Sequence, residues 1–344
     1  MNIFRSIFNS LTGIPKVRLV PYLGYGTANR LHLLGRALDD DALNIQQEQS
    51  FWQTLVNTYK QFDTDEIAGA KVELTLPSGA KLQVLTGPKG YFVFDGEQEE
   101  SLLPFVDGQG WMPLKTRFAE EPKDSVISGG NFYEGEMLIP PSSSKFGIIS
   151  DIDDTILHTG VTSFLKWRVL KNSLFKNAYD RISLEASPQL YQSLHQGVSG
   201  REQNPFFYLS NSPWNLYEYL RLFLMVNGFP KGPILLRHFR TPFDRSARPE
   251  KPHKQREILN LLQTYPHLKF VLIGDSGEHD PAIYTEIAER FPDRILAIYL
   301  RSVKHRRRMR RVQGLIEQFK TVPVVSVKHS KEAMAHAREL GLIQ

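Results

Sequence analysis

The sequence predicts two domains of different classes: a mainly-β, sandwich-like domain over residues 1–140 and an α/β domain with a parallel sheet over residues 146–344. Three observations support this division. The chain has 344 residues, which is long for one domain of 100–200 residues. Two prolines and three serines between Ile139 and Lys145 are typical of a linker, placed at 141–145. The hydrophobic pattern also changes across this stretch.

The N-terminal part reads as short strands separated by turn residues. Residues 72–76 alternate apolar and polar side chains, and a Pro-Ser-Gly turn follows at 77–79. A second such segment covers 81–85, and a third covers 91–94. Strands at this spacing, with few helical patterns between them, predict a sandwich-like β domain.

The C-terminal part contains near-continuous apolar runs of strand length. They lie at 146–149, 205–209, 269–273 and 294–300, and segments with helical periodicity separate them. Strands that are apolar on both faces and alternate with helices predict a parallel sheet covered on both sides.

Composition excludes several classes of protein. Hydrophobic residues make up 41% and charged residues 23% of the chain, and the mean hydropathy is −0.32. These values disfavour an integral membrane protein and a wholly disordered chain. The absence of cysteine excludes disulfides, thiol nucleophiles and cysteine-ligated zinc. We therefore predict a cytoplasmic protein.

The charge is unevenly divided between the two parts. Residues 1–144 hold 12 basic and 18 acidic residues, a net charge of −6, whereas residues 145–344 hold 30 and 19, a net charge of +11. A basic C-terminal part suggests an anionic partner, such as a phosphate group or a charged membrane surface.

Polar residues that could take part in catalysis or ligand binding follow three of the predicted strands and open one predicted helix. The set consists of Asp151, Asp153, Ser210, Lys254, Asp275 and Asp280. Because the carboxyl ends of parallel strands meet at one edge of a sheet, we expect these side chains to gather there.

The acidic pair suits group transfer. Of Asp151 and Asp153, one carboxylate can attack an electrophile while the other donates or accepts a proton. Asp275 and Asp280 would complete an oxygen-rich site suited to Mg²⁺. The alternative is ordinary loop and helix-capping chemistry. The ordered combination of an acidic pair, a serine, a lysine and then a Gly-Asp pair, three of them directly after apolar strands, disfavours it.

This ordered set resembles the haloacid-dehalogenase-like hydrolases over residues 145–301. The resemblance implies a Rossmann-like parallel sheet with a small cap insertion. It also implies that Asp151 is the nucleophile that forms an aspartyl-phosphate and that Asp153 is the acid/base. In the same family pattern Ser210 and Lys254 hold the phosphoryl oxygens. The ligands of Mg²⁺ would be Asp151, Asp153, Asp275 and Asp280.

A narrower resemblance covers residues 147–303. The segments SDIDDTI, SPWNLY, IGDSGEHDPAIY and RILAIYLRSV resemble the actin-patch-associated phosphatidate phosphatase family, and PYLGYGTANRLHLLGR near the N-terminus is similar to its bacterial members. The resemblance implies Mg²⁺-dependent hydrolysis of phosphatidate. Two alternatives stay open: a phosphatase of soluble phosphoesters or phosphoproteins, and a membrane- or protein-binding module with a vestigial hydrolase site.

Two basic segments offer a route to a membrane. Phe164–Tyr179 is basic and aromatic, and Lys304–Arg311 contains six basic residues in eight. An anionic membrane surface fits both segments and predicts peripheral contact. For Phe164–Tyr179 the alternative is a cap that packs on the core with a solvated basic edge. For Lys304–Arg311 it is a solvated face, the commoner role of such a run. Nucleic acid is disfavoured because no recognition motif accompanies the charge.

Overall fold

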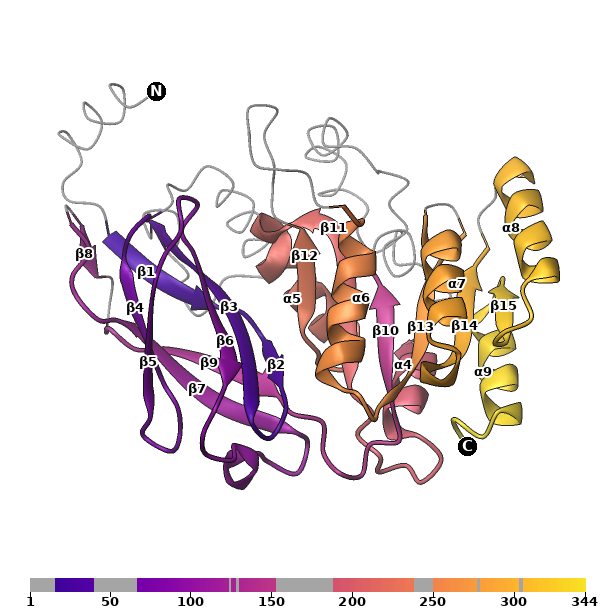
Figure 1. The fold of residues 1–344 in the computed structure, drawn as a ribbon, viewed down its shortest axis with the longest axis horizontal. Helices are drawn as coiled ribbons and strands as arrows, with labels where there is room; N and C mark the ends of the chain where they lie inside the picture. Colours follow the sequence, from indigo (N-terminus) through magenta and orange to yellow (C-terminus); the bar gives the residue numbers. More distant parts are fainter. Residues whose placement is uncertain are drawn as a thin grey trace. The chain divides into compact units, whose positions relative to one another are not determined.

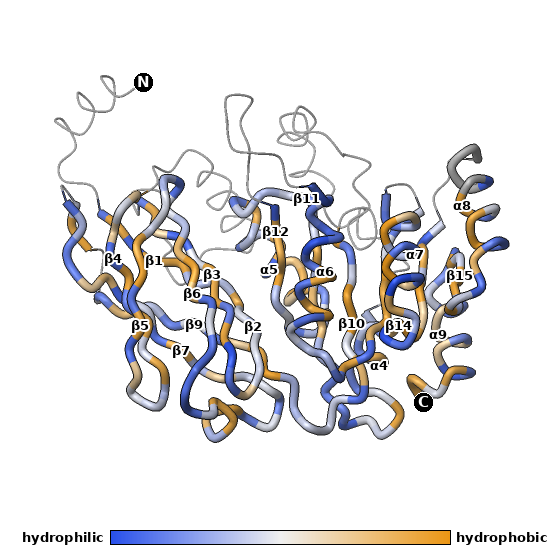
Figure 2. The backbone as a smooth tube through the Cα atoms, in the orientation of Figure 1, coloured by the Kyte–Doolittle hydropathy of each residue, from blue (hydrophilic) through white to orange (hydrophobic). Residues whose placement is uncertain are grey.

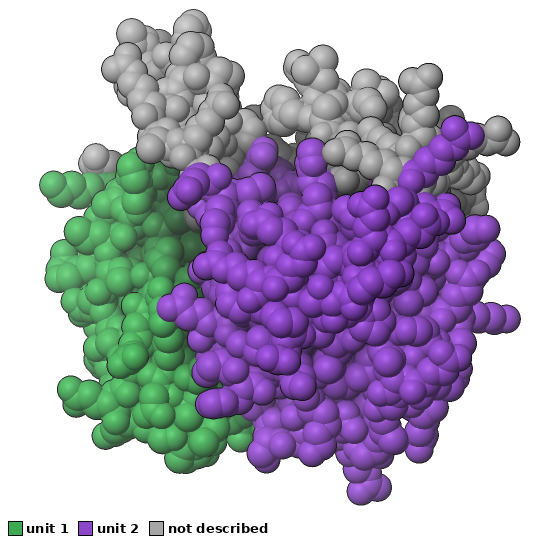
Figure 3. Space-filling view, turned by 45° about the vertical axis from the view of Figure 1, so that its right-hand side comes forward, with its two compact units in different colours: residues 1–139 green, residues 140–344 purple. Residues whose placement is uncertain are grey.

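A computed structural model of the chain describes residues 16–39, 67–123, 125–127, 130–152, 188–237, 250–276, 279–302 and 306–344. The chain divides into two compact units, Met1–Ile139 and Pro140–Gln344 (Figure 3). The division lies at the start of the Pro/Ser stretch. Each unit is described by itself below.

The first unit is a β domain. Its described strands are β1 (Lys16–Pro21), β2 (Gly24–Gly26), β3 (Arg30–Asp39), β4 (Lys71–Thr75), β5 (Lys81–Leu85), β6 (Tyr91–Glu97), β7 (Trp111–Phe118), β8 (Val126–Ile127) and β9 (Tyr133–Leu138), with a short 3₁₀ helix η2 (Leu103–Phe105). The strand order is β5-β4-β7-β9-β2-β3-β1-β8, and β6 pairs with β3.

This sheet differs in one respect from a sandwich of two separate sheets. The short strand β2 pairs with both β9 and β3, so the described strands form one continuous hydrogen-bonded network. Residues from both ends of the network nevertheless enter one buried cluster, including Leu33 on β3, Leu74 on β4, Phe92 on β6 and Met112 on β7. The unit therefore has a single core enclosed by one sheet.

The second unit alternates strands and helices. Its described elements are β10 (Phe146–Asp151), α4 (Pro188–Gln196), β11 (Phe206–Pro213), η3 (Trp214–Leu216), α5 (Tyr217–Val226), β12 (Ile234–Arg237), α6 (His253–Thr264), β13 (Lys269–Asp275), α7 (Asp280–Arg290), η4 (Pro292–Arg294), β14 (Ile295–Arg301), α8 (Arg306–Gln318), β15 (Val324–Val327) and α9 (Ser330–Glu339) (Figure 1). The described strands pair in parallel in the order β12-β11-β10-β13-β14-β15.

The predicted parallel sheet is confirmed, and the four apolar runs correspond to β10, β11, β13 and β14. All six residues of β10 are buried. In Figure 2 β10 carries mainly hydrophobic colour, whereas α6 alternates between hydrophilic and hydrophobic turns. This is expected of a helix that buries one apolar face, which here contains Ile258, Leu261 and Leu262.

The stretch predicted as a linker is hydrogen-bonded into the second unit. The hydroxyls of Ser143 and Ser144 donate to backbone carbonyls of the loop 202–204 at 3.0 and 2.9 Å. The amide of Lys145 donates to the side chain of Asn204 at 2.8 Å. These bonds fix the path by which the chain enters β10.

The strand order determines where a ligand can bind. β10 comes first in the unit, β11 and β12 are added on one side of it, and β13, β14 and β15 on the other. The order therefore reverses between β10 and β13. In open α/β sheets ligands bind outside the carboxyl ends of the strands at such a switch point.

Candidate active site

Two of the predicted acidic residues end the two strands that flank the switch point. Asp151 is the last residue of β10 and Asp275 the last residue of β13, and the two strands pair up to Ser150 and Ile273. Both carboxylate residues have no solvent-exposed surface. Adjacent strands with apolar interiors thus bring two carboxylates to one buried edge.

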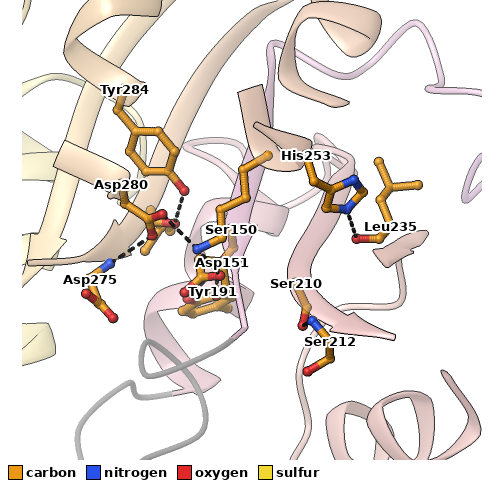
Figure 4. Close-up of polar contacts among 12 residues, drawn as sticks. Ser150, Asp151, Tyr191, Ser210, Ser212, Leu235, His253, Asp275, Asp280 and Tyr284 are labelled. Carbon is orange, nitrogen blue, oxygen red and sulfur yellow. Dashed lines mark hydrogen bonds and ion pairs between the residues drawn. The ribbon is translucent and has the colours of Figure 1, made fainter. Parts of the chain in front are cut away.

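Lys254 joins this edge from α6. Its Nζ lies 2.8 Å from Oδ1 of Asp151 and 2.7 Å from Oδ1 of Asp280 (Figure 4). The side chain of Lys254 is 2% exposed. A buried ammonium between two buried carboxylates offsets part of the cost of removing all three charges from water.

Asp280 is the first residue of α7 and is held from two sides. Its Oδ1 contacts Lys254, and its Oδ2 accepts the backbone N–H of Asp275 at 3.3 Å. Gly274 makes this approach possible, because a Cβ there would lie 2.6 Å from Oδ2 of Asp280 and 2.7 Å from Cε2 of Tyr284. In this structure Asp280 therefore anchors Lys254, and metal binding by Asp280 stays a prediction.

A second group of contacts lies on the other face of β10. Ser150 Oγ is 2.8 Å from the hydroxyl of Tyr191 on α4 and donates to the carbonyl of Asp151 at 3.0 Å. Consecutive strand residues point to opposite faces, so α4 and α6 cover opposite sides of the sheet. Burial raises the pKa of Tyr191 far above its usual value, so this phenol stays protonated.

Ser210 lies on β11, the other neighbour of β10, directly after Leu209, where the pairing of the two strands ends. The register of β11 against β12 shifts between Leu209 and Pro213, which leaves an irregular segment of the kind common beside active sites. Ser210 is fully buried, and its Oγ accepts the N–H of Ser212 at 2.9 Å. Figure 4 shows both serines set apart from Asp151 and Asp280.

Several predicted residues lie outside the described part of the chain. They are Asp153, the whole segment Phe164–Tyr179, and Lys304 from the basic run. The run re-enters the described chain at Arg306, where α8 begins. The acid/base role of Asp153 and the membrane role of the first segment stay predictions.

The described residues suit a hard divalent cation in charge and in ligand type. Asp151, Asp275 and Asp280 place three carboxylates at one buried edge, and Lys254 contributes one ammonium to them. Carboxylate oxygens are the ligands Mg²⁺ prefers. Within the described residues no three acidic, histidine or cysteine side chains form a complete metal-binding group, and Asp153 would supply a further ligand.

Ser150, Tyr191 and Tyr284 were not predicted from the sequence as site residues, and Gly274 was predicted only as half of the Gly-Asp pair after a strand. Tyr284 donates to the carbonyl of Ile273 at 3.2 Å. Gly274 immediately precedes Asp275, and its position beside that acidic residue was the one available signal. Ser150 and the two tyrosines are residue types common in any core, so the sequence carries no mark of their position.

The strand order and buried ion pairs define the second unit as a doubly wound α/β domain with a charged centre at its switch point. Residues 146–302 match the family model described as "Phosphatidate phosphatase APP1, catalytic domain". This segment begins with β10 and ends just after β14, and over it the chain is similar to the catalytic domain of that family.

Two relatives extend the comparison. The chain is 39% identical over 160 residues to Phosphatidate phosphatase APP1 of Saccharomyces cerevisiae, covering 45% of this chain and 25% of that protein. It is 29% identical over 232 residues to the uncharacterized protein C29B5.04c of Schizosaccharomyces pombe, covering 65% of this chain and 35% of that protein. The chain thus spans about a quarter to a third of the curated relatives it matches.

Proposed function

We propose that this chain is a phosphoric monoester hydrolase that removes phosphate from phosphatidate, with Mg²⁺ and an aspartyl-phosphate on Asp151. The observation that carries the proposal is the buried ion pair between Asp151 and Lys254 at the switch point, within the segment shared with the phosphatidate phosphatase APP1 family. The relative with 39% identity bears that activity in its name.

In the proposed reaction an oxygen of the Asp151 carboxylate attacks the phosphorus atom. An O–P bond forms to Asp151, and the bond between phosphorus and the lipid oxygen breaks. Asp153 donates the proton that the departing diacylglycerol needs, then takes one from the water that hydrolyses the acyl phosphate. The reaction returns both carboxylates to their starting states.

Lys254 has two roles in this scheme. By contacting Oδ1 of Asp151 it fixes the rotation of the carboxylate that attacks. Its positive charge also favours the approach of a phosphate group to a site that holds three carboxylates. Asp280, 2.7 Å from the same Nζ, keeps the ammonium in place.

Ser210 is proposed to contact a phosphoryl oxygen. Its Oγ accepts the N–H of Ser212, and a serine hydroxyl can donate its own proton at the same time. Mg²⁺, held by Asp151 and Asp275 with Asp153 and Asp280 as the further predicted ligands, would neutralise phosphate charge when bound.

We further propose that the enzyme reaches its lipid substrate by peripheral contact with an anionic membrane from the cytoplasm. Among the described helices none is long and apolar enough to span a bilayer. β14 ends at Arg301, so α8 begins at the edge where the other strands end (Figure 1). The part of the basic run that the structure describes starts with α8 at Arg306, close to this edge, and we propose it as one membrane contact. Phe164–Tyr179 is the second proposed contact.

The test is a substrate panel on one preparation of the full chain. Phosphatidate in mixed micelles should release phosphate faster than sugar phosphates or phosphopeptides, and chelation should stop the release. Asp151→Asn should abolish turnover, because an amide is a poor nucleophile. Full metal-dependent activity in that variant would refute the role of Asp151.

The panel also decides between the alternatives. Preference for sugar phosphates or phosphopeptides would replace the lipid substrate with a soluble one. A chain that releases phosphate from none of these compounds would be a binding module with a vestigial site.

A further inference from the structure

A chain of hydroxyl groups runs from α4 to the backbone of Asp151. Tyr191 on α4 meets Ser150 at 2.8 Å between oxygens, and Ser150 donates to the carbonyl oxygen of Asp151 at 3.0 Å. Ser150 is completely buried and Tyr191 is 1% exposed. None of the catalytic roles proposed above uses either hydroxyl.

The direction of these two hydrogen bonds follows from the number of hydroxyl protons that can be donated. A serine hydroxyl has one proton, and Ser150 gives it to the carbonyl of Asp151. The bond with Tyr191 is therefore donated by the phenol. Tyr191 O–H points to Ser150, and Ser150 O–H points to the backbone of Asp151.

The Asp151–Ile152 peptide group is thereby held at both of its polar atoms. Its carbonyl oxygen accepts from Ser150, and its N–H, on Ile152, donates to the carbonyl of Leu209 at 2.9 Å. These two bonds fix the plane of the peptide at the point where β10 ends. The side chain of Asp151 is held separately by Lys254.

Tyr191 is itself rigidly placed. Its ring stacks on Phe206 of β11 with centroids 5.4 Å apart and meets Phe229 edge-on at 5.0 Å. A phenol packed in this way has one rotamer, so its hydroxyl presents a fixed donor to Ser150. Through this hydroxyl, the position of α4 constrains the backbone at the end of β10.

We infer that Ser150 and Tyr191 are positioning residues for Asp151, fixing the backbone from which its carboxylate attacks. This inference rests on the proposed role of Asp151 as the nucleophile. Attack requires the reacting atoms to be aligned closely, and a displacement of about 1 Å can cost about a hundredfold in rate. The two hydroxyl hydrogen bonds reduce the freedom of one of the two peptide groups that flank the Cα of Asp151, from which its side chain begins.

The test compares two Tyr→Phe variants, each of which loses one buried hydroxyl group. Tyr208 is also fully buried, and its hydroxyl donates to the carbonyl of Pro230 at 2.7 Å, a contact that does not involve Asp151. Tyr191→Phe should lower kcat about tenfold with KM changed less than about twofold. Tyr208→Phe should leave kcat within about twofold of the parent while losing a comparable buried hydrogen bond.

Two further measurements make the test specific. Ser150→Ala removes both bonds and should lower kcat at least as much as Tyr191→Phe, whereas Ser150→Thr keeps the hydroxyl and should restore most of the rate. Amide exchange at Ile152 should be about tenfold faster in Tyr191→Phe than in Tyr208→Phe.

The outcomes separate this inference from the proposed function. If the two Tyr→Phe variants lose the same activity and exchange alike at Ile152, the hydroxyl chain is ordinary core structure and the inference is overturned. A parent chain without phosphatase activity would refute the proposed function instead. The exchange comparison would then decide by itself whether Tyr191 holds this peptide group.

Discussion

Replacing Lys254 with Met tests the electrostatics of the site most directly. The ammonium lies 2.8 and 2.7 Å from carboxylates of Asp151 and Asp280, and all three residues are at most 2% exposed. Met keeps most of the side-chain volume but leaves two buried charges without this partner. Removing one member of a buried ion pair costs about 3–5 kcal/mol, and we expect a loss in that range.

The surface pair of Lys71 with Glu120 provides the matched control. Its nitrogen and oxygen are 3.0 Å apart, but the two side chains are 41% and 72% exposed. Exposed ion pairs contribute less than about 1 kcal/mol, so Lys71→Met should change stability by no more than that. The two substitutions are chemically identical, but Lys254 is buried between two carboxylates whereas Lys71 is an exposed partner of Glu120.

The measurement is native-state hydrogen exchange of the full chain in the presence of a chelator. Exchange of amides in β10 and β13 reports the free energy of opening the second unit, and exchange in β4, which carries Lys71, reports that of the first unit. A single unfolding curve of a two-unit chain does not separate the two values. Lowering the pH should recover part of the loss in Lys254→Met, because the two carboxylates then bind protons in the folded state. If Lys254→Met costs no more than Lys71→Met, the buried ion pairs do not form.

Three other predictions concern separate parts of the chain. Gly274→Ala should displace Asp280, which would lower kcat about tenfold and destabilise the second unit by about 1–3 kcal/mol. Gly314→Ala is the control and should have neither effect, because no atom lies within 4 Å of a Cβ at Gly314. The pKa of Glu73 is lowered from 4.5 to about 2, chiefly by a hydrogen bond from a neighbouring arginine, so its stabilising contribution is complete above pH 4.5 and lost toward pH 2. The free energy of opening β4, measured by amide exchange, should therefore change less between pH 5 and 2 in Glu73→Gln than in the parent. An equal change in both proteins would contradict this prediction. Changing the three arginines at 306–308 to Gln should weaken binding to anionic vesicles by about 3 kcal/mol and leave hydrolysis of a short-chain soluble substrate unchanged. If the variant sediments with vesicles as well as the parent does, the basic run is only a solvated face.

The parallel sheet of the second unit was predictable because its signal is local. A buried strand needs only a short apolar run, and the polar residue that ends it follows directly in the chain. Asp151 and Asp275 were identified in this way as residues at strand ends, and both lie where the strand order reverses. β12 and β15, with four residues each, were too short to stand out from their surroundings.

Contacts between distant segments were not predictable in the same way. Lys254 was expected to hold a phosphoryl oxygen, and nothing in the sequence pattern indicated its contact with an aspartate 26 positions later in the chain. In the first unit β2 joins two groups of strands by pairing with both β3 and β9. Periodicity indicates which face of a strand is buried but contains no information about its partner.

The contacts around Asp151 separate the part of the site that fixes the proposed nucleophile from the part that must select the substrate. Lys254 holds the side chain of Asp151 from one face of the sheet, Ser150 holds its carbonyl from the other, and Leu209 holds the next amide from the adjoining strand. Each of these contacts comes from a core element, and none involves the group that a substrate phosphate would carry. Under the proposed mechanism, such a site would accept any phosphomonoester that reaches it. Choice of a lipid therefore has to come from segments that follow the strand ends, which is why the substrate panel and the vesicle experiment test different parts of the proposal from Asp151→Asn.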